Sequence, residues 1–177
     1  MEKEFTLSIF TENKIGLLNR ITIIFTRRHL NIESITASES EIKNVHRYTI
    51  VCRTTRERIE KVVKQIEKLV EVLRAFVHEE DDVVHQEIAL YKVRNSTASL
   101  KMNFEKIVRD NHARILDVTP EYIVIEKTGH KKETQDLFEK ISPMGVLEFA
   151  RSGRVAITKP MKELTTYLKE MEEAQNN

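Results

Sequence analysis

The sequence predicts an α+β protein made of two tandem units, each with the element order β-α-β-β-α-β. Apolar residues alternate with a period of two in some segments and recur at helical spacing in the segments between them. Short polar turns join the middle strands of each unit, as in antiparallel hairpins. A charged run, His78 to Asp82, then separates two halves that repeat the same order.

The first strand and the first helix are predicted from a change in apolar spacing. Phe5 to Phe10 alternates apolar and polar residues until its last position, as a strand with one buried face does. Glu12-Asn13-Lys14 breaks this alternation. From Gly16 onward the apolar residues fall on one helical stripe, which consists of Leu17, Leu18, Ile21, Ile24 and Phe25. We therefore expect a strand, a short turn and a helix.

A hairpin, a second helix and a fourth strand complete the first unit. Asn31 to Ser40 and Val45 to Arg53 are predicted strands, and the short polar turn between them indicates an antiparallel pair. Thr54 and Glu57 have the spacing of a capping box, so the second helix is expected to begin there. Leu69 to Val77 is the predicted fourth strand.

The second half repeats this order without obvious sequence identity to the first. Its predicted strands are Val84 to Val93, Ala113 to Val118, Tyr122 to Glu126 and Val146 to Ala150. Helices are expected around Leu100 to Val108 and over roughly Lys131 to Ile141. A short apolar piece, Val155-Ala156-Ile157, precedes a C-terminal helix that we expect to start near Pro160.

Each half therefore has the ferredoxin-like topology, in which two helices cover one face of an antiparallel sheet. We expect a first domain at residues 1–77, a linker at 78–83, a second domain at 84–158, and a helix and tail at 159–177. The uncovered sheet face and the exposed edge strands could be satisfied by a second copy of the chain, so a homodimer is expected.

Charge and composition exclude several classes of protein. The 177 residues carry 29 Lys and Arg against 28 Asp and Glu, and this balance argues against a nucleic-acid binder. Cys52 is the single cysteine and cannot form an internal disulfide. No apolar signal segment follows Met1, and no apolar run approaches the roughly 20 residues of a membrane span. We expect a cytoplasmic protein.

The sequence offers no convincing catalytic or metal-binding group. No base is placed beside Cys52, so it is predicted to be a structural thiol, and His46 is interpreted as a solvated hairpin residue. His78 and His85 flank an acidic run that could ligate a divalent metal, but an exposed linker explains the same run. The motifs HExxH, CxxC and GxxxxGK[ST] are absent.

One segment, Glu12 to Leu18, has the chemistry of a binding site. Gly16 at a helix start lets backbone N–H groups approach a ligand closely, and these donors together with the helix dipole favour a carboxylate. Asn13 adds a side-chain amide, and the amide carbonyl of Asn31 could accept a hydrogen bond from an ammonium group. A ligand that carries both a carboxylate and an ammonium group is an amino acid.

Three apolar residues could supply a pocket for an aliphatic side chain of such a ligand: Ile15, Leu17 and Ile32. The alternative is that Gly16 only starts the helix, Asn13 caps it and Asn31 turns the chain out of it. Caps and turns use the same residue types as the proposed site, so the spacing alone leaves both interpretations open.

Two segments resemble the signature of ACT domains, which are ferredoxin-like modules that bind amino acids at subunit interfaces: Glu12 to Leu18 and Asn31 to Ile35. Four further blocks resemble the small regulatory subunits of acetolactate synthase (acetohydroxyacid synthase): Lys68 to Arg74, Glu87 to Val93, Ile115 to Pro120 and Ala150 to Gly153. The resemblance covers roughly residues 3 to 158.

This resemblance implies a non-catalytic partner of a large subunit that condenses 2-oxoacids in branched-chain amino-acid synthesis. It implies activation of that subunit and feedback inhibition, most often by valine. No cofactor is expected in this chain, while thiamine diphosphate, Mg and FAD are expected in the catalytic partner. Asn13, Gly16 and Asn31 match positions associated with effector binding across an ACT dimer, and Ile15 departs from the Pro or small residue often found there.

Three other functions stay open from the sequence. The chain could be an ACT-type sensor that serves another amino-acid enzyme or a transcriptional regulator. It could regulate nucleic acid through the same fold, although it has neither basic halves nor a recognisable helix-turn-helix. It could also be a stand-alone small enzyme, although no reactive group supports that function.

Overall fold

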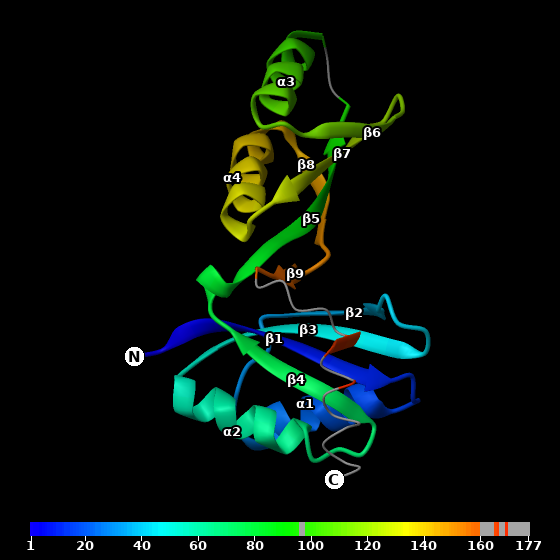
Figure 1. Ribbon diagram of the computed structural model, residues 1–177. Coiled ribbons are helices and arrows are strands. Elements are labelled where there is room, and N and C mark those ends of the chain that lie inside the picture. Colours follow the sequence, from blue (N-terminus) through cyan, green and yellow to red (C-terminus); the bar gives the residue numbers. More distant parts are fainter. Residues whose placement is uncertain (96–97, 160–164, 167–168, 170–177) are drawn as a thin grey trace. The chain divides into compact units, whose positions relative to one another are not determined.

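The computed structural model describes residues 1–95, 98–159, 165–166 and 169, and divides the chain into two compact units (Figure 1). The first unit contains Met1–Val84 together with the segment that starts at Arg154, and the second contains His85–Gly153. Each unit has one antiparallel sheet with two helices on one of its faces. The α+β class and the ferredoxin-like topology are thus confirmed.

The first unit has the predicted order of elements. They are β1 (Lys3–Glu12), α1 (Leu17–Arg27), β2 (Ser34–Glu39), β3 (Val45–Thr54), α2 (Arg56–Ile66) and β4 (Val72–His78). The strand order across the sheet is β2-β3-β1-β4, with all neighbours antiparallel. The strand β2 therefore lies at one edge of the sheet and β4 at the other.

The second unit repeats the arrangement. Its elements are β5 (Val83–Arg94), α3 (Ala98–Asp110), β6 (Arg114–Val118), β7 (Tyr122–Gly129), α4 (Lys131–Ile141) and β8 (Val146–Arg151). The order of these strands is β6-β7-β5-β8. Short 3-10 turns at Glu80–Asp82 and Ser142–Met144 precede β5 and β8, and a final strand, β9, covers Val155–Thr158.

The first core is formed by the buried faces of β1, α1 and α2. Alternate residues of β1, namely Phe5, Leu7 and Ile9, are fully buried and face the helices. They pack with residues from one stripe of each helix: Leu17, Ile21 and Phe25 from α1, and Ile59, Val62 and Ile66 from α2. Full burial of each such side chain stabilises the fold by about 1.5–3 kcal/mol. The second core is built in the same way around Tyr91 and Ile125.

The other face of the first sheet is polar and is nevertheless buried. Thr6, Ser8 and Thr49 alternate with core residues along β1 and β3, and each has an exposed fraction of 4% or less. The segment Arg154–Thr158 lies on this face, where the backbone carbonyl groups of Arg154 and Ala156 accept hydrogen bonds from the sheet. The chain itself therefore covers part of the face that we expected to be left for a second subunit.

The expected bounds of the two domains stay a prediction. The segment that starts at Arg154 groups with the first unit through hydrogen bonds to β1, β2 and β3, and its strand β9 also pairs with β5. The expected C-terminal helix from Pro160, with Leu164 and Leu168 on its apolar face, falls almost entirely outside the described residues.

Two local expectations are wrong. The second helix begins at Arg56 with Thr55 as its N-cap, whereas Thr54 is the last residue of β3, so Thr54 and Glu57 do not form a capping box. The second strand begins at Ser34 and not at Asn31, because the chain first has to leave α1. It does so through His29, whose φ of 52° is in the left-handed region.

Candidate functional site

The loop between β1 and α1 is held by backbone hydrogen bonds to two other parts of the first unit. The Glu12 N–H donates to the Glu71 carbonyl at 2.9 Å, just before β4. The Asn13 N–H donates to the Asn44 carbonyl at 3.2 Å, in the turn between β2 and β3. The side chain of Asn13 is exposed. The loop is therefore fixed while its outer surface faces solvent.

Gly16 is the N-cap of α1 and has a φ of 82°, in the left-handed region that glycine adopts without strain. A Cβ atom at this position would meet no heavy atom within 4 Å. Glycine is therefore favoured here by the backbone angle and not by a lack of space for a side chain. The following N–H groups of Leu18 and Asn19 have no acceptor within the helix. No acidic residue occupies the first turn of α1, so this helix end favours a bound anion.

An ion pair fixes the first turns of this helix. The Arg20 Nη1 atom on α1 lies 2.6 Å from the Glu71 Oε1 atom, and this hydrogen bond is the main cause that lowers the pKa of Glu71. Glu71 also bonds the loop through its backbone carbonyl. One residue therefore positions both the loop and the helix that follows it.

Asn31 lies at the opposite end of α1 from Asn13 and Gly16. The helix runs from Leu17 to Arg27, and ten steps of about 1.5 Å give a length of about 15 Å. Asn31 is exposed just beyond the helix C-terminus. A single copy of the chain therefore does not bring the three predicted polar residues together around one amino acid.

The three predicted apolar residues have different environments. Ile15 is fully exposed at the tip of the loop, with an exposed fraction of 108%, and Ile32 is half-buried against the first core. Leu17 is 1% exposed and packs inside that core in a single copy of the chain. Leu18, the next residue, is 42% exposed, and sequence reasoning placed it on the helical stripe and not in the site.

The edge strand β2 continues from the Asn31 end of α1. It pairs with β3 on one side only, and Ala37, Ser38 and Glu39 are exposed. An edge strand presents unpaired backbone groups to a further strand. The segment with Asn31 is thus next to a surface at which a second copy could pair.

A separate groove of about 460 Å³ lies between α1 and α2, and it contains none of the predicted site residues. Its lining is Ile24, Arg27, Arg28, Gln65, Lys68 and Leu69. Arg27, Arg28 and Lys68 lie at or near the C-terminal ends of the two helices, where the helix dipole favours positive charge. The Arg28 Nε atom also donates to Gln65 Oε1 at 2.7 Å, which joins the two helices.

The cysteine and the histidines do not form a reactive centre among the described residues. Cys52 is fully buried, and burial, followed by the charges of Glu33 and Glu4, raises the pKa of its thiol to about 12. This confirms that Cys52 is a structural thiol. His46 is half-buried, and its Nε2 atom is buried without a hydrogen-bond partner, so it is not the solvated residue that we expected.

The possible metal ligands next to the acidic run are also engaged elsewhere. His78 is buried and stacks on Phe76, and burial is the main cause that lowers its pKa. His85 contacts the His130 ring edge-on with ring centres 4.5 Å apart. Within the part of the chain that the structure describes, no three His, Cys, Asp or Glu side chains are grouped as a metal site would require.

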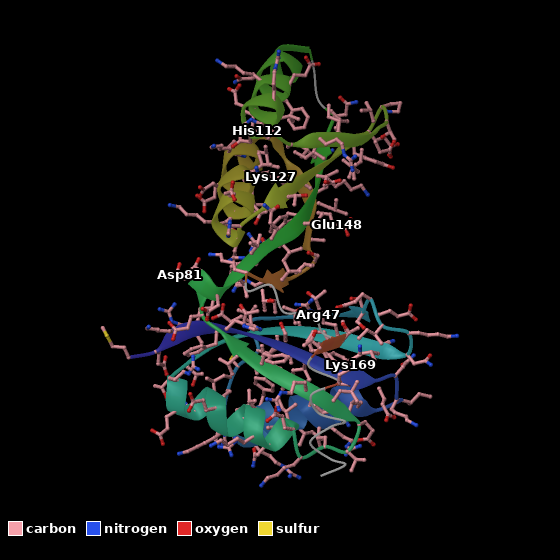
Figure 2. The ribbon with its side chains drawn as sticks, viewed as in Figure 1. Arg47, Asp81, His112, Lys127, Glu148 and Lys169 are labelled. Carbon is pink, nitrogen blue, oxygen red and sulfur yellow. The ribbon has the colours of Figure 1, made fainter. Side chains whose placement is uncertain are left out.

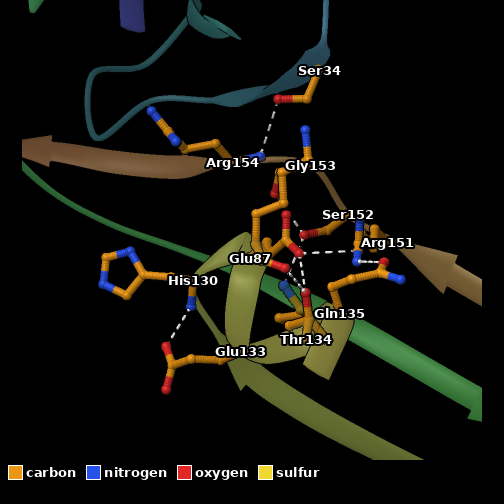
Figure 3. Close-up of polar contacts among 12 residues, drawn as sticks. Ser34, Glu87, His130, Glu133, Thr134, Gln135, Arg151, Ser152, Gly153 and Arg154 are labelled. Atoms are coloured by element: carbon orange, nitrogen blue, oxygen red, sulfur yellow. Dashed lines mark hydrogen bonds and ion pairs between the residues drawn. The ribbon is translucent and has the colours of Figure 1, made fainter. Parts of the chain in front are cut away.

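A buried polar cluster in the second unit was missed by the sequence reasoning (Figure 3). Glu87 on β5 accepts a hydrogen bond from the Thr134 hydroxyl group on α4, and its Oε1 atom lies 3.1 Å from the Arg151 Nε atom on β8. Arg151 also donates to Gln135 at 2.7 Å. The cluster joins α4 to the sheet, which gives Glu87 and Arg151 a structural role within the unit.

Within residues 1–95 and 98–159, no helix is both long enough and apolar enough to cross a bilayer.

The chain matches two family models and several relatives among known proteins. Residues 7–74 match the model described as the AHAS small subunit-like ACT domain, and residues 86–160 match the small subunit of acetolactate synthase. The acetolactate synthase small subunit of Bacillus subtilis is 36% identical over 160 residues, which is 90% of this chain and 91% of the relative. That of Mycolicibacterium smegmatis is 35% identical over 154 residues, with 87% and 90% covered.

A solved structure of the same family also matches most of the chain. The crystal structure of the acetolactate synthase small subunit from Thermotoga maritima superposes with a TM-score of 0.82 at 31% sequence identity. The match covers 90% of this chain and 99% of that chain.

Proposed function

Because the chain belongs to the acetolactate synthase small-subunit family, we propose that it binds an acetolactate synthase large subunit, raises its activity and confers feedback inhibition by valine. In this proposal the small subunit carries the regulatory site, and the large subunit carries thiamine diphosphate, Mg and FAD. We assign no catalytic step to this chain in this proposal.

One observation carries the proposed effector site: the polar residues that match an amino acid lie at opposite ends of α1. The valine carboxylate would bind the Gly16 helix start and Asn13 of one copy. Its ammonium group would bind the Asn31 amide of a second copy. Each site then needs two copies, and a symmetric dimer contains two such sites.

The apolar part of the site would come from the residues left accessible around these groups. Ile15, which is fully exposed, and Leu18, which is partly exposed, belong to the helix-start side of the site. Ile32 belongs to the Asn31 side. An interface that encloses these side chains would bury both them and the valine isopropyl group, so effector binding and pairing of the copies would stabilise each other.

The energetic demand on this site is modest. A dissociation constant near 0.1 mM corresponds to roughly −5.5 kcal/mol. Two or three charge-assisted hydrogen bonds and one buried isopropyl group are sufficient for that affinity. A coupling free energy of about 1–3 kcal/mol to the large subunit would then change its activity several-fold.

The edge strand β2 supports the proposed homodimer better than the open sheet face does. The face opposite the helices is partly covered by Arg154–Thr158 of the same chain, whereas β2 has one unpaired side. Pairing through β2 would also place the Asn31 segment at the interface. Light scattering at micromolar protein concentration tests this, and a monomeric mass would contradict it.

Reconstitution with the large subunit tests the function directly. We expect the small subunit to raise acetolactate formation and to make it sensitive to valine, with leucine and isoleucine as comparisons. A large subunit whose activity does not change on addition of this chain would contradict the proposal. Co-purification with a different amino-acid enzyme would favour an ACT-type sensor instead.

A further inference from the structure

The groove between α1 and α2, here called the helix groove, belongs to the first unit alone. Figure 2 shows many side chains of these two helices pointing away from the sheet. Ile24 and Leu69 are partly buried in the groove and pack against the first core. Arg27, Gln65 and Lys68 also line it and are exposed. Its volume of about 460 Å³ lies within the range of ordinary binding pockets.

Two hydrogen bonds hold the walls of the helix groove together. The Arg28 Nε atom donates to the Gln65 Oε1 atom at 2.7 Å. The Arg58 Nη2 atom on α2 donates to the backbone carbonyl of Arg28 at 2.8 Å. Both bonds join the end of α1 to α2. The groove is therefore formed without a bound partner, which lowers the conformational cost of binding.

Among the described residues, three cationic side chains and no acidic one line the helix groove: Arg27, Arg28 and Lys68. Within the same part of the chain, neither Arg27 nor Lys68 has an ion pair or a side-chain hydrogen bond. Glu67 precedes Lys68 in the sequence, but its Oε1 atom lies 3.5 Å from the Arg74 Nη1 atom on β4. The groove therefore concentrates positive charge in a chain whose net charge is only +1.

The helix dipole alone does not account for this concentration. The dipole favours cations near helix C-termini, but it does not remove their acidic partners. Other cations of α1 and α2 are paired within the first unit: Arg20 with Glu71, Arg56 with Glu60, and Lys61 with Glu57. Arg27 and Lys68 lack such a pair among the described residues. An anion from outside the chain would supply the missing counter-charge.

A protein segment fits the helix groove better than a small anion does. The exposed cations would leave a small anion in water, where an ion pair contributes little. A protein segment also covers the groove, so it excludes water from the ion pairs and buries Ile24 and Leu69. Val70, which follows Leu69 in the sequence, is 90% exposed and adds apolar surface. The matching segment carries both acidic and aliphatic side chains.

From these observations we infer that the helix groove binds an acidic segment of the acetolactate synthase large subunit. Asp or Glu side chains of that segment pair with Arg27, Arg28 and Lys68, and an aliphatic side chain between them contacts Ile24 and Leu69. The inference rests on the proposed function, which supplies the large subunit as the partner. It adds the surface through which the two subunits meet.

This surface would connect the large subunit to the proposed effector site. The helix α1 starts directly after Gly16, and its C-cap Arg28 lies three positions before Asn31. A large subunit bound in the helix groove therefore contacts the helix whose two ends carry the polar effector residues. A change at either end of α1 reaches the bound segment within the first unit.

Charge reversal tests the inference on the full-length chain and its complex with the large subunit. Lys68→Glu, alone and combined with Arg27→Glu, reverses cations that have no partner among the described residues, so no contact in that part of the chain is removed. Lys64→Glu is the matched control. Lys64 is exposed in the last turn of α2 but does not line the groove.

Biolayer interferometry with the purified large subunit gives the dissociation constants. At about 0.1 M NaCl we expect Lys68→Glu to weaken binding by about fivefold and the double variant by about 20-fold, while Lys64→Glu changes it by less than about twofold. Raising NaCl to about 0.5 M should weaken wild-type binding and reduce its advantage over the double variant, because salt screens exposed charges. Thermal unfolding checks that each variant is folded.

Cross-linking of the wild-type complex identifies the occupant without any substitution. A carbodiimide reagent joins the Lys68 amine to a carboxylate in contact with it as an amide. We expect mass spectrometry to find Lys68 joined to an Asp or Glu residue of the large subunit.

Equal weakening by Lys68→Glu and Lys64→Glu would overturn the inference, because it would indicate a general effect of charge. Cross-links from Lys68 only to carboxylates of the small subunit would also overturn it and would assign the helix groove to this chain or to a second copy. If the wild-type chain does not bind the large subunit at all, the proposed function fails as well. The two failures are distinguishable because wild-type binding is measured beside each variant.

Discussion

Glu87 and Arg151 form a largely buried ion pair in the second unit, with the Arg151 Nε and Glu87 Oε1 atoms 3.1 Å apart. The exposed fractions of the two side chains are 10% and 22%. The Nε atom is buried without hydrogen-bond geometry to any partner, so the contact between these two atoms is Coulombic, while the Thr134 hydroxyl group supplies a hydrogen bond to Glu87. Charge neutralisation therefore allows a carboxylate at this position.

Replacing only one member of this pair should destabilise the second unit. Arg151→Ala leaves the Glu87 carboxylate buried without its counter-charge, and we expect a loss of about 3 kcal/mol in the free energy of unfolding. Chemical denaturation followed by circular dichroism measures this. The double variant Glu87→Gln with Arg151→Met should recover most of the loss. Equal losses in the single and double variants would show that packing, and not charge, dominates.

Gly16→Ala should cost stability through backbone strain alone. The φ of 82° is unfavourable for alanine by about 1–2 kcal/mol, and the added methyl group meets no neighbouring atom. Gly16→Asn is the matched control, because asparagine tolerates the left-handed region better. We expect thermal unfolding to rank the proteins as glycine, asparagine, then alanine. An alanine variant as stable as the wild type would contradict the assigned conformation.

Asn13→Ala and Asn31→Ala should each keep activation of the large subunit and weaken valine inhibition by about tenfold, the effect of about 1.4 kcal/mol. Inhibition curves of the reconstituted holoenzymes measure both quantities. The expected loss comes from one charge-assisted hydrogen bond in each variant. An unchanged curve for either variant would remove that residue from the site.

Mixing these two variants tests whether the site is shared between copies. A dimer of one Asn13→Ala copy and one Asn31→Ala copy contains one doubly altered site and one intact site. Refolding the two proteins together should therefore restore part of the valine inhibition that each lacks alone. If both residues acted within one copy, the mixture would behave as the average of the two single variants.

Cys52 makes stability sensitive to alkaline pH. Burial raises the pKa of its thiol from 9.0 to about 12, so the folded state holds the proton more tightly than the unfolded state. The associated stability is fully present below pH 9 and is lost as the pH rises from about 9 towards 12. Urea denaturation at pH 8 and pH 10.5 should show this decrease, and Cys52→Ala should show a smaller one. An identical decrease in the variant would assign the effect to other groups.

Local periodicity was sufficient to predict most of the elements. The alternation in β1 and the helical stripe of α1 are both visible in the sequence, because each buries one face against the other. The capping-box prediction was wrong because two threonines are adjacent. Thr54 is the last residue of β3, and Thr55 is the N-cap of α2. Spacing alone does not decide between two adjacent residues of the same type.

Long-range contacts account for what could not be predicted. Glu87 lies at an inward-facing position of β5, and its partner Arg151 is distant in the sequence, so local spacing could not predict the pair. Leu17 was predicted to belong both to the helical stripe and to the site. Its side chain faces inward and packs in the first core. The segment Arg154–Thr158 is too short to show any periodicity, and its contacts with β1 and β2 span more than 100 residues.

The segment Arg154–Thr158 makes the first unit discontinuous in sequence, because the residues of the second unit stand between its two parts. Arg154 bonds Glu4 across 150 residues, so the polar face of the first sheet stays without this contact until the residues of the second unit have been synthesised. The helical side of that sheet can form early from nearby segments, whereas closure of the long loop comes late. During translation, the first unit would therefore be completed only by a segment made after the second unit, which links completion of the first unit to synthesis of the second.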